Sequence, residues 1–458
     1  MSKSQVSHTI DMCSGPMAGK IFQFVIPLMV SSILQLLFNA ADIIVVSRFC
    51  GDEALAAVGS TSSLINLTVG LFIGMSTASN IIAARLMGER NFEKLHKVVH
   101  TSILVSVISG ILLAAIGITF AEKALKLMGS PDDVIELSTL YLRIYFIGTP
   151  ANLIYNFGSS LLRAKGDTKR PLYIITLAGV INFVLNLFFV AFCGRNVDGV
   201  AIATVVSQVV SAVLIIICLM SDNDHMRLNI KELKIHKKEL LEILRIGLPA
   251  GIQGMVFSFS NITIQSAVNS FGKNTMAGYA AANSIQGFLY VAGNAFYQAN
   301  MTFTSQNMGA NQWDRMKRSM KLNILFEVII CTALGIIAFC FATPLLGIYT
   351  TDAAVVQEGI TVMKYNCLLV VLCGLMETIM GGIRGMGYTI MTMVVSILGS
   401  CVLRIIWVAS VFNIFPTTDV LFSIYPISWI LTSFIHLMCY LVIFPRKKKL
   451  AELKNVDV

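Results

Sequence analysis

One acidic residue, Asp42, stands inside the first long apolar run of the sequence. On a helix, Asp42 shares one face with Asn39, Gln35 and Ser31, which precede it at spacings of three, four and four residues. An ionised carboxylate inside a membrane is costly unless water or a partner compensates it. The stripe therefore predicts a helix that lines a wet cavity. The alternative is a carboxylate at the outer end of the span that reaches interfacial water.

A pair of asparagines could hold this carboxylate. Asn182 and Asn186 stand four residues apart in a later apolar run, so both point the same way from a helix. Buried amides need hydrogen-bond partners, and Asp42 is the natural candidate. A carboxyl group surrounded by amides rather than by arginine could exchange protons near neutral pH. The alternative role of the two amides is to bond neighbouring helices together.

A second polar stripe lies in the other half of the sequence. It includes Gln286, Tyr290 and Asn294 at near-helical spacing. Aromatic and amide side chains together suit large, partly apolar ligands, whereas tyrosines alone also occur in interfacial belts. Glu377 is a further acid within an apolar run. We expect it to face a cleft, where it could pair with a cationic substrate or bind a second proton.

The composition is that of an all-α polytopic membrane protein. The chain has 458 residues, of which 56% are hydrophobic and only 13% charged, and its apolar runs repeatedly reach the roughly 20 residues that span a bilayer as helix. The first run is longer than the core of a signal peptide, so we expect it to remain as the first span. Twelve spans are predicted, near residues 21–47, 54–84, 98–121, 134–162, 171–193, 197–220, 246–270, 275–307, 322–347, 355–383, 388–412 and 419–444.

The distribution of basic residues orients these spans. The net charge is +9, but most Lys and Arg residues fall in the segments on one side of the predicted membrane, which argues against nucleic acid as a partner. The few on the other side are Arg48, Lys123, Lys126, Arg195 and Lys273. The positive-inside rule then predicts a plasma (inner) membrane protein with both termini in the cytoplasm.

The second half of the sequence repeats the first. MGERNFEKLHK (87–97) corresponds to MGANQWDRMKR (308–318) without a gap, and the two stretches are 221 residues apart. Arg163, Gly166 and Thr168 correspond in the same way to residues 384, 387 and 389. Matching of polar loop residues across more than one loop is strong evidence of an internal duplication.

The duplication predicts two lobes of six helices. We expect an N-lobe over residues 1–220, a cytoplasmic linker over 221–245, and a C-lobe with a basic tail over 246–458. Because each half has an even number of spans, the lobes should be related by a pseudo-two-fold axis along the membrane normal. This predicts a V-shaped molecule with a central cleft that binds substrate.

No metal site, cofactor or catalytic centre is predicted. The ten cysteines are scattered, and none stands in a C-x-x-C pair. A membrane-embedded transferase would need catalytic residues clustered at one membrane face, and the sequence offers no H-x-x-x-D motif or metal-ligand set there. The chain is therefore not expected to be an enzyme.

These features together resemble the multidrug and toxic compound extrusion (MATE) family over nearly the whole chain. The resemblance rests on Asn39 and Asp42 in the pattern N-x-x-D, and on GDEALAAVG (51–59), LLRAKGDTKRP (161–171) and GVAIATVVSQ (199–208) in this order. It implies a cation-driven antiporter that exports amphipathic, often cationic compounds by alternating access. Asp42 matches the acid of the family's first lobe, and Asn182 its asparagine partner, whereas Asn186 stands where a common family pattern has Asp.

The coupling ion and the substrate class follow as expectations. The sodium-coupled branch of the family has a Glu where this chain has Phe257, so the resemblance favours H⁺, with Na⁺ as the alternative. A flippase for lipid-linked saccharides is a second alternative, but it would need a strongly basic cleft. We expect a monomer in the lipid bilayer that acts on small organic cations. The predicted ion-coupling residues are Asp42, Asn39, Asn182 and Asn186, and the predicted substrate-binding residues are Gln35, Gln286, Tyr290, Asn294 and Glu377.

Overall fold

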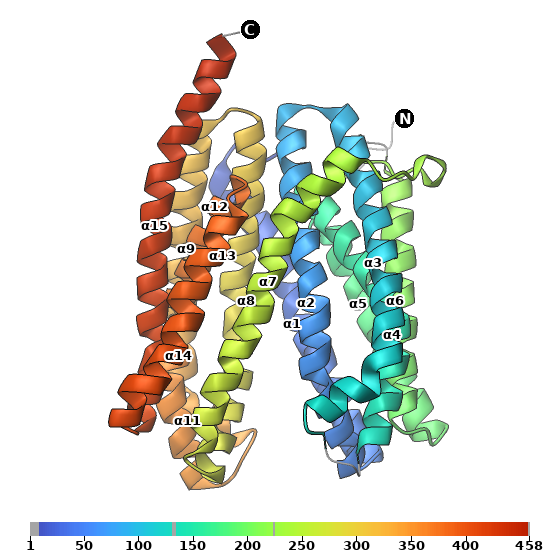
Figure 1. Ribbon diagram of the computed structural model, residues 1–458, viewed down its shortest axis with the longest axis vertical. Helices are drawn as coiled ribbons and strands as arrows, with labels where there is room; N and C mark the ends of the chain where they lie inside the picture. Colours follow the sequence, from blue (N-terminus) through green and yellow to red (C-terminus); the bar gives the residue numbers. More distant parts are fainter. Residues whose placement is uncertain (1–8, 131–133, 223–224, 457–458) are drawn as a thin grey trace. The chain divides into compact units, whose positions relative to one another are not determined.

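The computed structural model describes residues 9–130, 134–222 and 225–456, and every regular element within these ranges is a helix (Figure 1). The all-α class predicted from the sequence is confirmed. Asn91, at the start of the third helix, illustrates how side chains set the helix boundaries: its side chain accepts a hydrogen bond from the Lys94 N–H at 3.2 Å. This bond satisfies one of the donors left open at a helix N-terminus.

The first half of the chain forms seven helical elements. They are α1 (Met17–Phe49), α2 (Asp52–Glu89), α3 (Phe92–Leu127), α4 (Ile135–Ala164), α5 (Lys169–Asn186), a π-helical turn (Leu187–Phe192) and α6 (Val197–Met220).

A linker with one short 3₁₀ turn (Ile230–Glu232) leads into the second half. The helices there are α7 (Lys237–Asn269), α8 (Lys273–Gly309), α9 (Trp313–Cys340), α10 (Ala342–Gly347), α11 (Ala353–Asn366), α12 (Val370–Gly385), α13 (Thr389–Ser396), α14 (Leu403–Trp407) and α15 (Thr418–Val456). The π-helical turn Ile397–Val402 joins α13 to α14, and a second one, Val408–Phe412, follows α14, so that Thr389–Phe412 forms one continuous span. The predicted tenth span corresponds to α11 and α12 together.

Ten helices of the described ranges are long and apolar enough to cross a membrane. The remaining two of the twelve predicted spans correspond to α4 and α8, which have 30 and 37 residues. These two helices have sufficient length, but polar side chains such as Asn152 and Asn294 lower their hydropathy. In membrane helices, such side chains usually face a protein interior or a water-filled cavity.

The internal repeat of the sequence is also present in the backbone. Three pairs of residues with left-handed backbone conformation stand 221 residues apart: Gly51 and Gly272 (φ 85° and 93°), Arg90 and Asn311 (both 55°), and Gly166 and Gly387 (89° and 88°). The π-helical turns Leu187–Phe192 and Val408–Phe412 correspond at the same offset. A left-handed conformation is uncommon for any residue but glycine, so its recurrence at matched positions supports the duplication.

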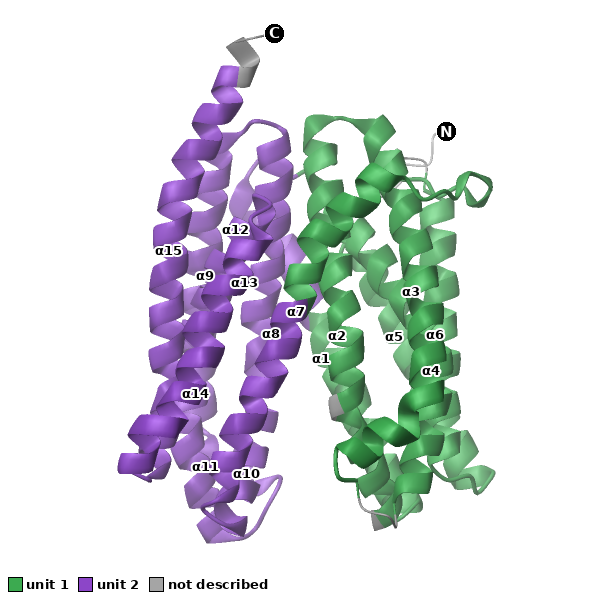
Figure 2. Cartoon of the chain, in the orientation of Figure 1, with its two compact units in different colours: residues 1–11, 30–251 green, residues 12–29, 252–458 purple. Residues whose placement is uncertain are grey.

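The chain forms two compact units (Figure 2). Unit 1 contains residues 1–11 and 30–251, and unit 2 contains residues 12–29 and 252–458. The first part of α1 therefore groups with the second half of the chain, and the first part of α7 with the first half. The lobe boundaries predicted at residues 220 and 246 stay a prediction.

Small residues let the helices of unit 1 approach closely. A Cβ atom on Gly74 of α2 would lie 2.3 Å from the backbone N of Gly251 on α7, and one on Gly110 of α3 would lie 2.4 Å from Cα of Pro150 on α4. Helices in lipid associate through such van der Waals contact rather than through a hydrophobic effect.

Unit 2 combines close packing with a buried aromatic core. A Cβ atom on Gly293 of α8 would lie 2.9 Å from Cα of Gly374 on α12. The hydroxyl groups of Tyr279 and Tyr425 are 2.9 Å apart and buried, which connects α8 to α15. The polar tips of both tyrosines are thus satisfied inside an apolar cluster.

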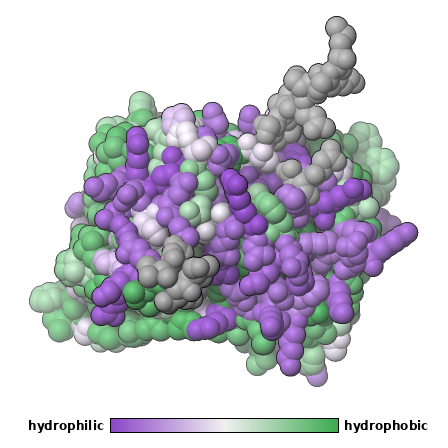
Figure 3. All heavy atoms as spheres, turned by 90° about the horizontal axis from the view of Figure 1, so that it is seen from above, coloured by the Kyte–Doolittle hydropathy of each residue, from purple (hydrophilic) through white to green (hydrophobic). Residues whose placement is uncertain are grey.

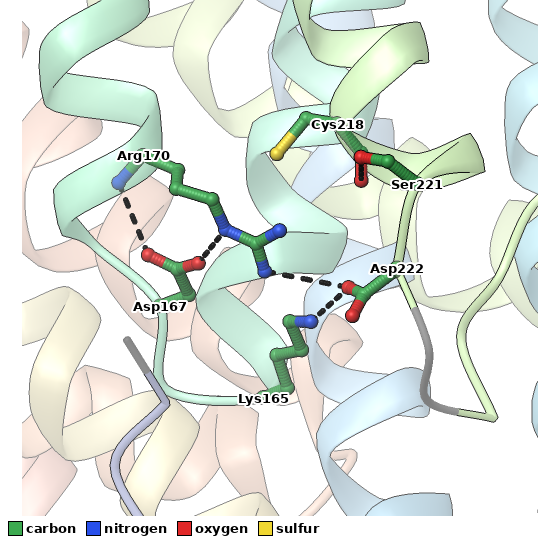
Figure 4. A network of polar contacts seen from close by, with 6 residues as sticks. All are labelled: Lys165, Asp167, Arg170, Cys218, Ser221 and Asp222. Carbon is green, nitrogen blue, oxygen red and sulfur yellow. Dashed lines mark hydrogen bonds and ion pairs between the residues drawn. The ribbon is translucent and has the colours of Figure 1, made fainter. Parts of the chain in front are cut away.

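One end of the molecule is rich in hydrophilic side chains, as Figure 3 shows in a view onto the upper end of Figure 1. In unit 1, an ion-pair network ties the α4–α5 loop to the start of the linker (Figure 4). Asp222 accepts from Lys165 and, at 3.3 Å, from Nη2 of Arg170, which also pairs with Asp167. Lys165 and Asp167 are buried.

Candidate functional site

Unit 1 encloses a polar cavity of about 340 Å³ between its helices. Its lining comes from α1, α2, α4, α5 and α6, and is made of amides, hydroxyls, aromatic rings and one carboxyl group. The lining residues are Gln35, Phe38, Asn39, Asp42, Val69, Ile73, Tyr141, Tyr145, Asn152, Tyr155, Asn156, Ile175, Ala178, Gly179, Asn182, Thr204, Ser207, Gln208 and Ser211.

The carboxyl group of Asp42 meets both asparagines predicted to hold it. The Asn186 amide nitrogen donates to Oδ1 of Asp42. With its own amide nitrogen turned toward the carboxyl group, Asn182 donates to Oδ1 at 2.8 Å and to Oδ2 at 3.3 Å. Asn182 and Asn186 are buried, whereas Asp42 is partly exposed. The site therefore stabilises a carboxylate by neutral donors while leaving it open to the cavity.

The backbone of α5 is adapted to this contact. The helix changes to π geometry at Leu187, directly after Asn186, and such turns often occur at functional sites. Gly179, two turns earlier, leaves room for the ring of Phe38, since a Cβ atom there would lie 1.9 Å from the ring. The glycine thus allows α1 to bring Asp42 close to α5.

The cavity also contains residues that sequence analysis did not single out. Asn152 and Asn156 on α4 are hydrogen-bonded to each other at 2.9 Å, and Tyr141 and Gln208 line the same space. Their signal is an i, i+4 pair of amides within a predicted span, which is the same pattern that identified Asn182 and Asn186. The predicted residues Asn39 and Gln35 both line the cavity.

The other predicted substrate-binding residues lie in unit 2. The Tyr290 hydroxyl on α8 donates to Oε1 of Glu377 on α12 at 2.6 Å, and Gln298 donates to Asn294 at 2.7 Å. Gln286 lies on α8 and is partly exposed. The structure thus brings Tyr290 and Glu377 together, but it places Gln35 in the separate cavity of unit 1. Roles of these residues in substrate binding stay a prediction.

Glu327 on α9 is an acid within the ninth predicted span, six residues after Lys321, and this spacing alone suggests a near-surface partner for that lysine. Glu327 is fully buried. Its carboxyl group packs against Gly374 of α12 so closely that a Cβ atom on Gly374 would lie 2.1 Å from Oε1 of Glu327. The earlier interpretation, a near-surface partner for Lys321, is wrong because α9 turns this side chain toward α12.

The fold and a polar cavity with one acid define a polytopic membrane transporter. The family profile MatE matches residues 27–188 and 249–409. "Probable multidrug resistance protein YoeA" of Bacillus subtilis is 30% identical over 82% of this chain and 82% of its own length. "FAD transporter" of Shewanella oneidensis is 26% identical over 75% of this chain and 77% of its own. A crystal structure described as MATE in complex with MaL6 has a TM-score of 0.90 at 22% identity, covering 96% of this chain and 98% of the other.

The chain therefore belongs to the MatE family, as the sequence predicts. The two matched segments lie in the two halves of the internal repeat, so each half matches the family profile on its own. The structural similarity extends over nearly the whole chain and shows the shared fold.

Proposed function

We propose that this chain exports amphipathic organic cations in exchange for protons, with Asp42 as the proton-binding group. The observation that supports this most is the charge of the cavity in unit 1. Among the described residues that line it, Asp42 is the one ionisable acid, and none is Lys or Arg. A cation entering the cavity meets a single negative charge, and a proton can cancel that charge.

The lining suits organic cations. The rings of Phe38, Tyr141 and Tyr145 offer aromatic faces to a positive charge, and the amide pair on α4 offers hydrogen bonds. The volume of about 340 Å³ lies at the lower end of the range for small-molecule sites. The name of the B. subtilis relative, a probable multidrug resistance protein, supports the same substrate class.

Anionic substrates fit this cavity less well. The S. oneidensis relative is named an FAD transporter, and a dinucleotide carries phosphates that proteins bind with Arg, Lys or helix N-termini. A lipid-linked saccharide also carries phosphate groups. Because the described lining of the unit 1 cavity contains no basic side chain, we favour a cation as the substrate.

The hydrogen bonds at Asp42 favour a proton over Na⁺. Hard cations bind oxygen atoms, but the two asparagines can direct their amide nitrogens at the carboxylate. Oδ1 of Asn186 is buried and has no hydrogen-bond partner within the described ranges. A protonated Asp42 would supply the missing donor after a small rotation of either group, so both protonation states can be satisfied.

The exchange of a proton for a substrate cation follows from the two protonation states of Asp42. Binding of a cation stabilises the ionised carboxylate and releases its proton, and binding of a proton removes the charge that holds the cation. Alternating access then gives net export when protons enter from outside. We place the chain in the cell membrane as a monomer with both termini in the cytoplasm, because its basic residues concentrate in the predicted cytoplasmic segments.

The test is transport of a fluorescent cationic dye by purified protein in liposomes. An imposed pH gradient should drive uptake by wild-type protein, and Asp42→Asn should reduce it at least about tenfold, whereas Glu122→Gln removes an exposed acid outside the cavity and should transport normally. Wild-type rates in Asp42→Asn would disprove the role of Asp42. Uptake driven by a Na⁺ gradient alone would show that the ion is not the proton.

A further inference from the structure

A cluster of histidines lies where the linker packs onto α3 of unit 1. His96 and His100 belong to the first turns of α3, and His225 and His236 belong to the linker, so this region holds four of the six histidines of the chain. The proposed transport function uses none of them.

Two contacts hold the linker against α3. The ring of His225 stacks on Phe92 with a centroid separation of 3.6 Å, and the backbone N–H of His236 donates to the Thr101 hydroxyl at 3.2 Å. The linker between these two histidines is therefore fixed beside the start of α3. Its 3₁₀ turn, Ile230–Glu232, faces the remaining two histidines.

Three potential ligand atoms converge at this point. Nε2 of His96 lies 2.8 Å from Oε2 of Glu232, and the rings of His96 and His100 meet edge to face, with centroids 4.0 Å apart. One ligand atom from each of the three residues lies within 4.8 Å of the other two. His100 is buried, whereas His96 and Glu232 are reachable from solvent.

The tautomer of His100 suits a metal ligand. Its Nδ1 lies 2.8 Å from the backbone oxygen of His96, which can only accept, so Nδ1 carries the hydrogen and Nε2 carries the lone pair. A histidine that binds a metal usually donates its other N–H to a carbonyl or carboxylate in this way. The lone pair of Nε2 at present accepts from the Asn229 N–H at 3.0 Å, and the Asn229 backbone oxygen lies 3.2 Å from the same nitrogen. A metal ion would displace the Asn229 backbone from this position.

Asn229 also fixes the position of Glu232. Its amide nitrogen donates to Oε1 of Glu232 at 2.5 Å, and its side-chain oxygen caps the 3₁₀ turn by accepting from the Lys231 N–H at 3.2 Å. The second carboxylate oxygen, Oε2, is thereby directed at His96. Asn229 thus orients the Glu232 carboxylate, and hydrogen bonds of this kind commonly orient the ligands of metal sites.

We propose that His96, His100 and Glu232 bind a divalent transition-metal ion of the zinc class, which fastens the linker to α3. Two imidazoles and a carboxylate form a common ligand set for Zn²⁺, with the fourth position left to water. Zinc bonds of about 2.0–2.2 Å place ligand atoms about 3.4 Å apart. The longest separation, at most 4.8 Å, would therefore shorten by up to about 1.4 Å, and the 2.8 Å contact between His96 and Glu232 would lengthen by about 0.6 Å.

The sequence contains a signal for this site. His96 and His100 stand four residues apart, a spacing that places two ligands on one helix face. The prediction of no metal site took no account of this pair. The third ligand follows more than a hundred residues later, and only the packing of the linker brings it near.

Metal binding should be measured on the full-length protein in detergent by titration with Zn²⁺, and with Co²⁺ as a spectroscopic probe. We expect one high-affinity ion per chain, and a Co²⁺ spectrum without the charge-transfer absorption that thiolate ligands produce. His96→Gln and Glu232→Gln should each weaken binding by about a hundredfold or more. His236→Ala changes a linker histidine outside the ligand set and keeps its backbone bond to Thr101, so it should bind like the wild type.

A second measurement separates a metal site from a plain ion pair between His96 and Glu232. Hydrogen exchange of backbone amides in residues 225–236 should slow when Zn²⁺ is added to wild-type protein or to His236→Ala, but not when it is added to His96→Gln. Equal zinc affinity in all four proteins would overturn the proposal. The proposal would also be overturned by a thiolate absorption band, or by hydrogen exchange in the linker of the wild type that does not change when Zn²⁺ is added.

Discussion

The cavity of unit 1 has a single carboxyl group, and its partners are amides. Asn186 donates to Asp42, and Asn182 can do so from one turn earlier on the same helix. An arginine in their place would hold the carboxylate permanently ionised, whereas neutral donors allow it to bind and release a proton. This choice of partner is the feature on which proton coupling depends in our proposal.

Asn186→Asp should change the choice of ion. The substitution places a second carboxylate against Asp42, which supplies both oxygen ligands and negative charge for a hard cation. We expect dye transport by the variant to respond to a Na⁺ gradient, to which the wild type should be indifferent. Transport measured in liposomes with opposed Na⁺ and pH gradients tests this, and Asn156→Asp on α4 provides a control that adds an acid to the cavity away from Asp42. A Na⁺ response in the control but not in Asn186→Asp would contradict the assignment.

Gly179→Ala should disturb the site through packing alone. The added methyl group would meet the ring of Phe38 at 1.9 Å, so the ring must move into the cavity or push α1 and Asp42 away from α5. We expect a folded protein with at least about tenfold slower dye transport. Gly70→Ala is the matched control, because a Cβ atom there meets nothing within 4 Å. Equal rates in both variants would show that contact between α1 and α5 at this point is not needed.

At the scale of secondary-structure elements, ion pairs join the α4–α5 loop to the start of the linker. Asp222 at the end of α6 accepts from Lys165 and Arg170, and Arg170 is held in turn by Asp167 (Figure 4). Buried charges of this kind are stable only as a complete set, because each one is costly without its partners. The set fixes where the linker leaves unit 1, and thus where it reaches the histidines of α3.

Asp222→Asn should destabilise the protein. Lys165 is buried, and replacing its charged partner by an amide should cost about 1.5–3 kcal/mol. We expect the midpoint of thermal unfolding in detergent to fall by several degrees. Glu122→Gln breaks an exposed ion pair with Lys126 and should leave the midpoint unchanged. If the two variants unfold at the same temperature, the network has no structural role.

At the scale of the whole chain, the two halves share a backbone plan but differ in chemistry. The left-handed residues and the π-helical turns recur 221 residues apart. The positions that correspond to Asn182 and Asn186, however, hold Leu403 and Trp407. The second half therefore repeats the shape of α5 without its amides, so the asparagine pair that meets Asp42 has no counterpart at these positions.

The predicted orientation can be checked with cysteines already present in the chain. Cys193 follows α5 and Cys340 ends α9, and both are exposed on the side that we predict to face outward. In single-cysteine variants, a membrane-impermeant maleimide should label Cys193 from outside intact cells, whereas Cys340 lies within the predicted span 322–347 and should react less. Cys13, on the predicted cytoplasmic side, should react only after the membrane is opened. The reverse pattern would invert the topology.

The sequence by itself determined the membrane class, the duplication and the acid that meets two amides inside unit 1. Apolar runs, basic loops and ungapped repeats are local or one-dimensional signals, and an acid in an apolar run is conspicuous because its burial is costly. The i, i+4 spacing of Asn182 and Asn186 predicted that both amides contact Asp42. In the structure, both can donate hydrogen bonds to the Asp42 carboxyl group.

Only the tertiary structure decided which polar side chains share a space. It added Asn152 and Asn156 to the cavity, placed Tyr290 against Glu377, and turned Glu327 inward. These outcomes depend on helix rotation and on where glycines permit close approach, and neither is encoded in spacing along one helix. The meeting of His96 and His100 with Glu232 is of the same kind, since contacts between distant segments are set by packing rather than by sequence separation.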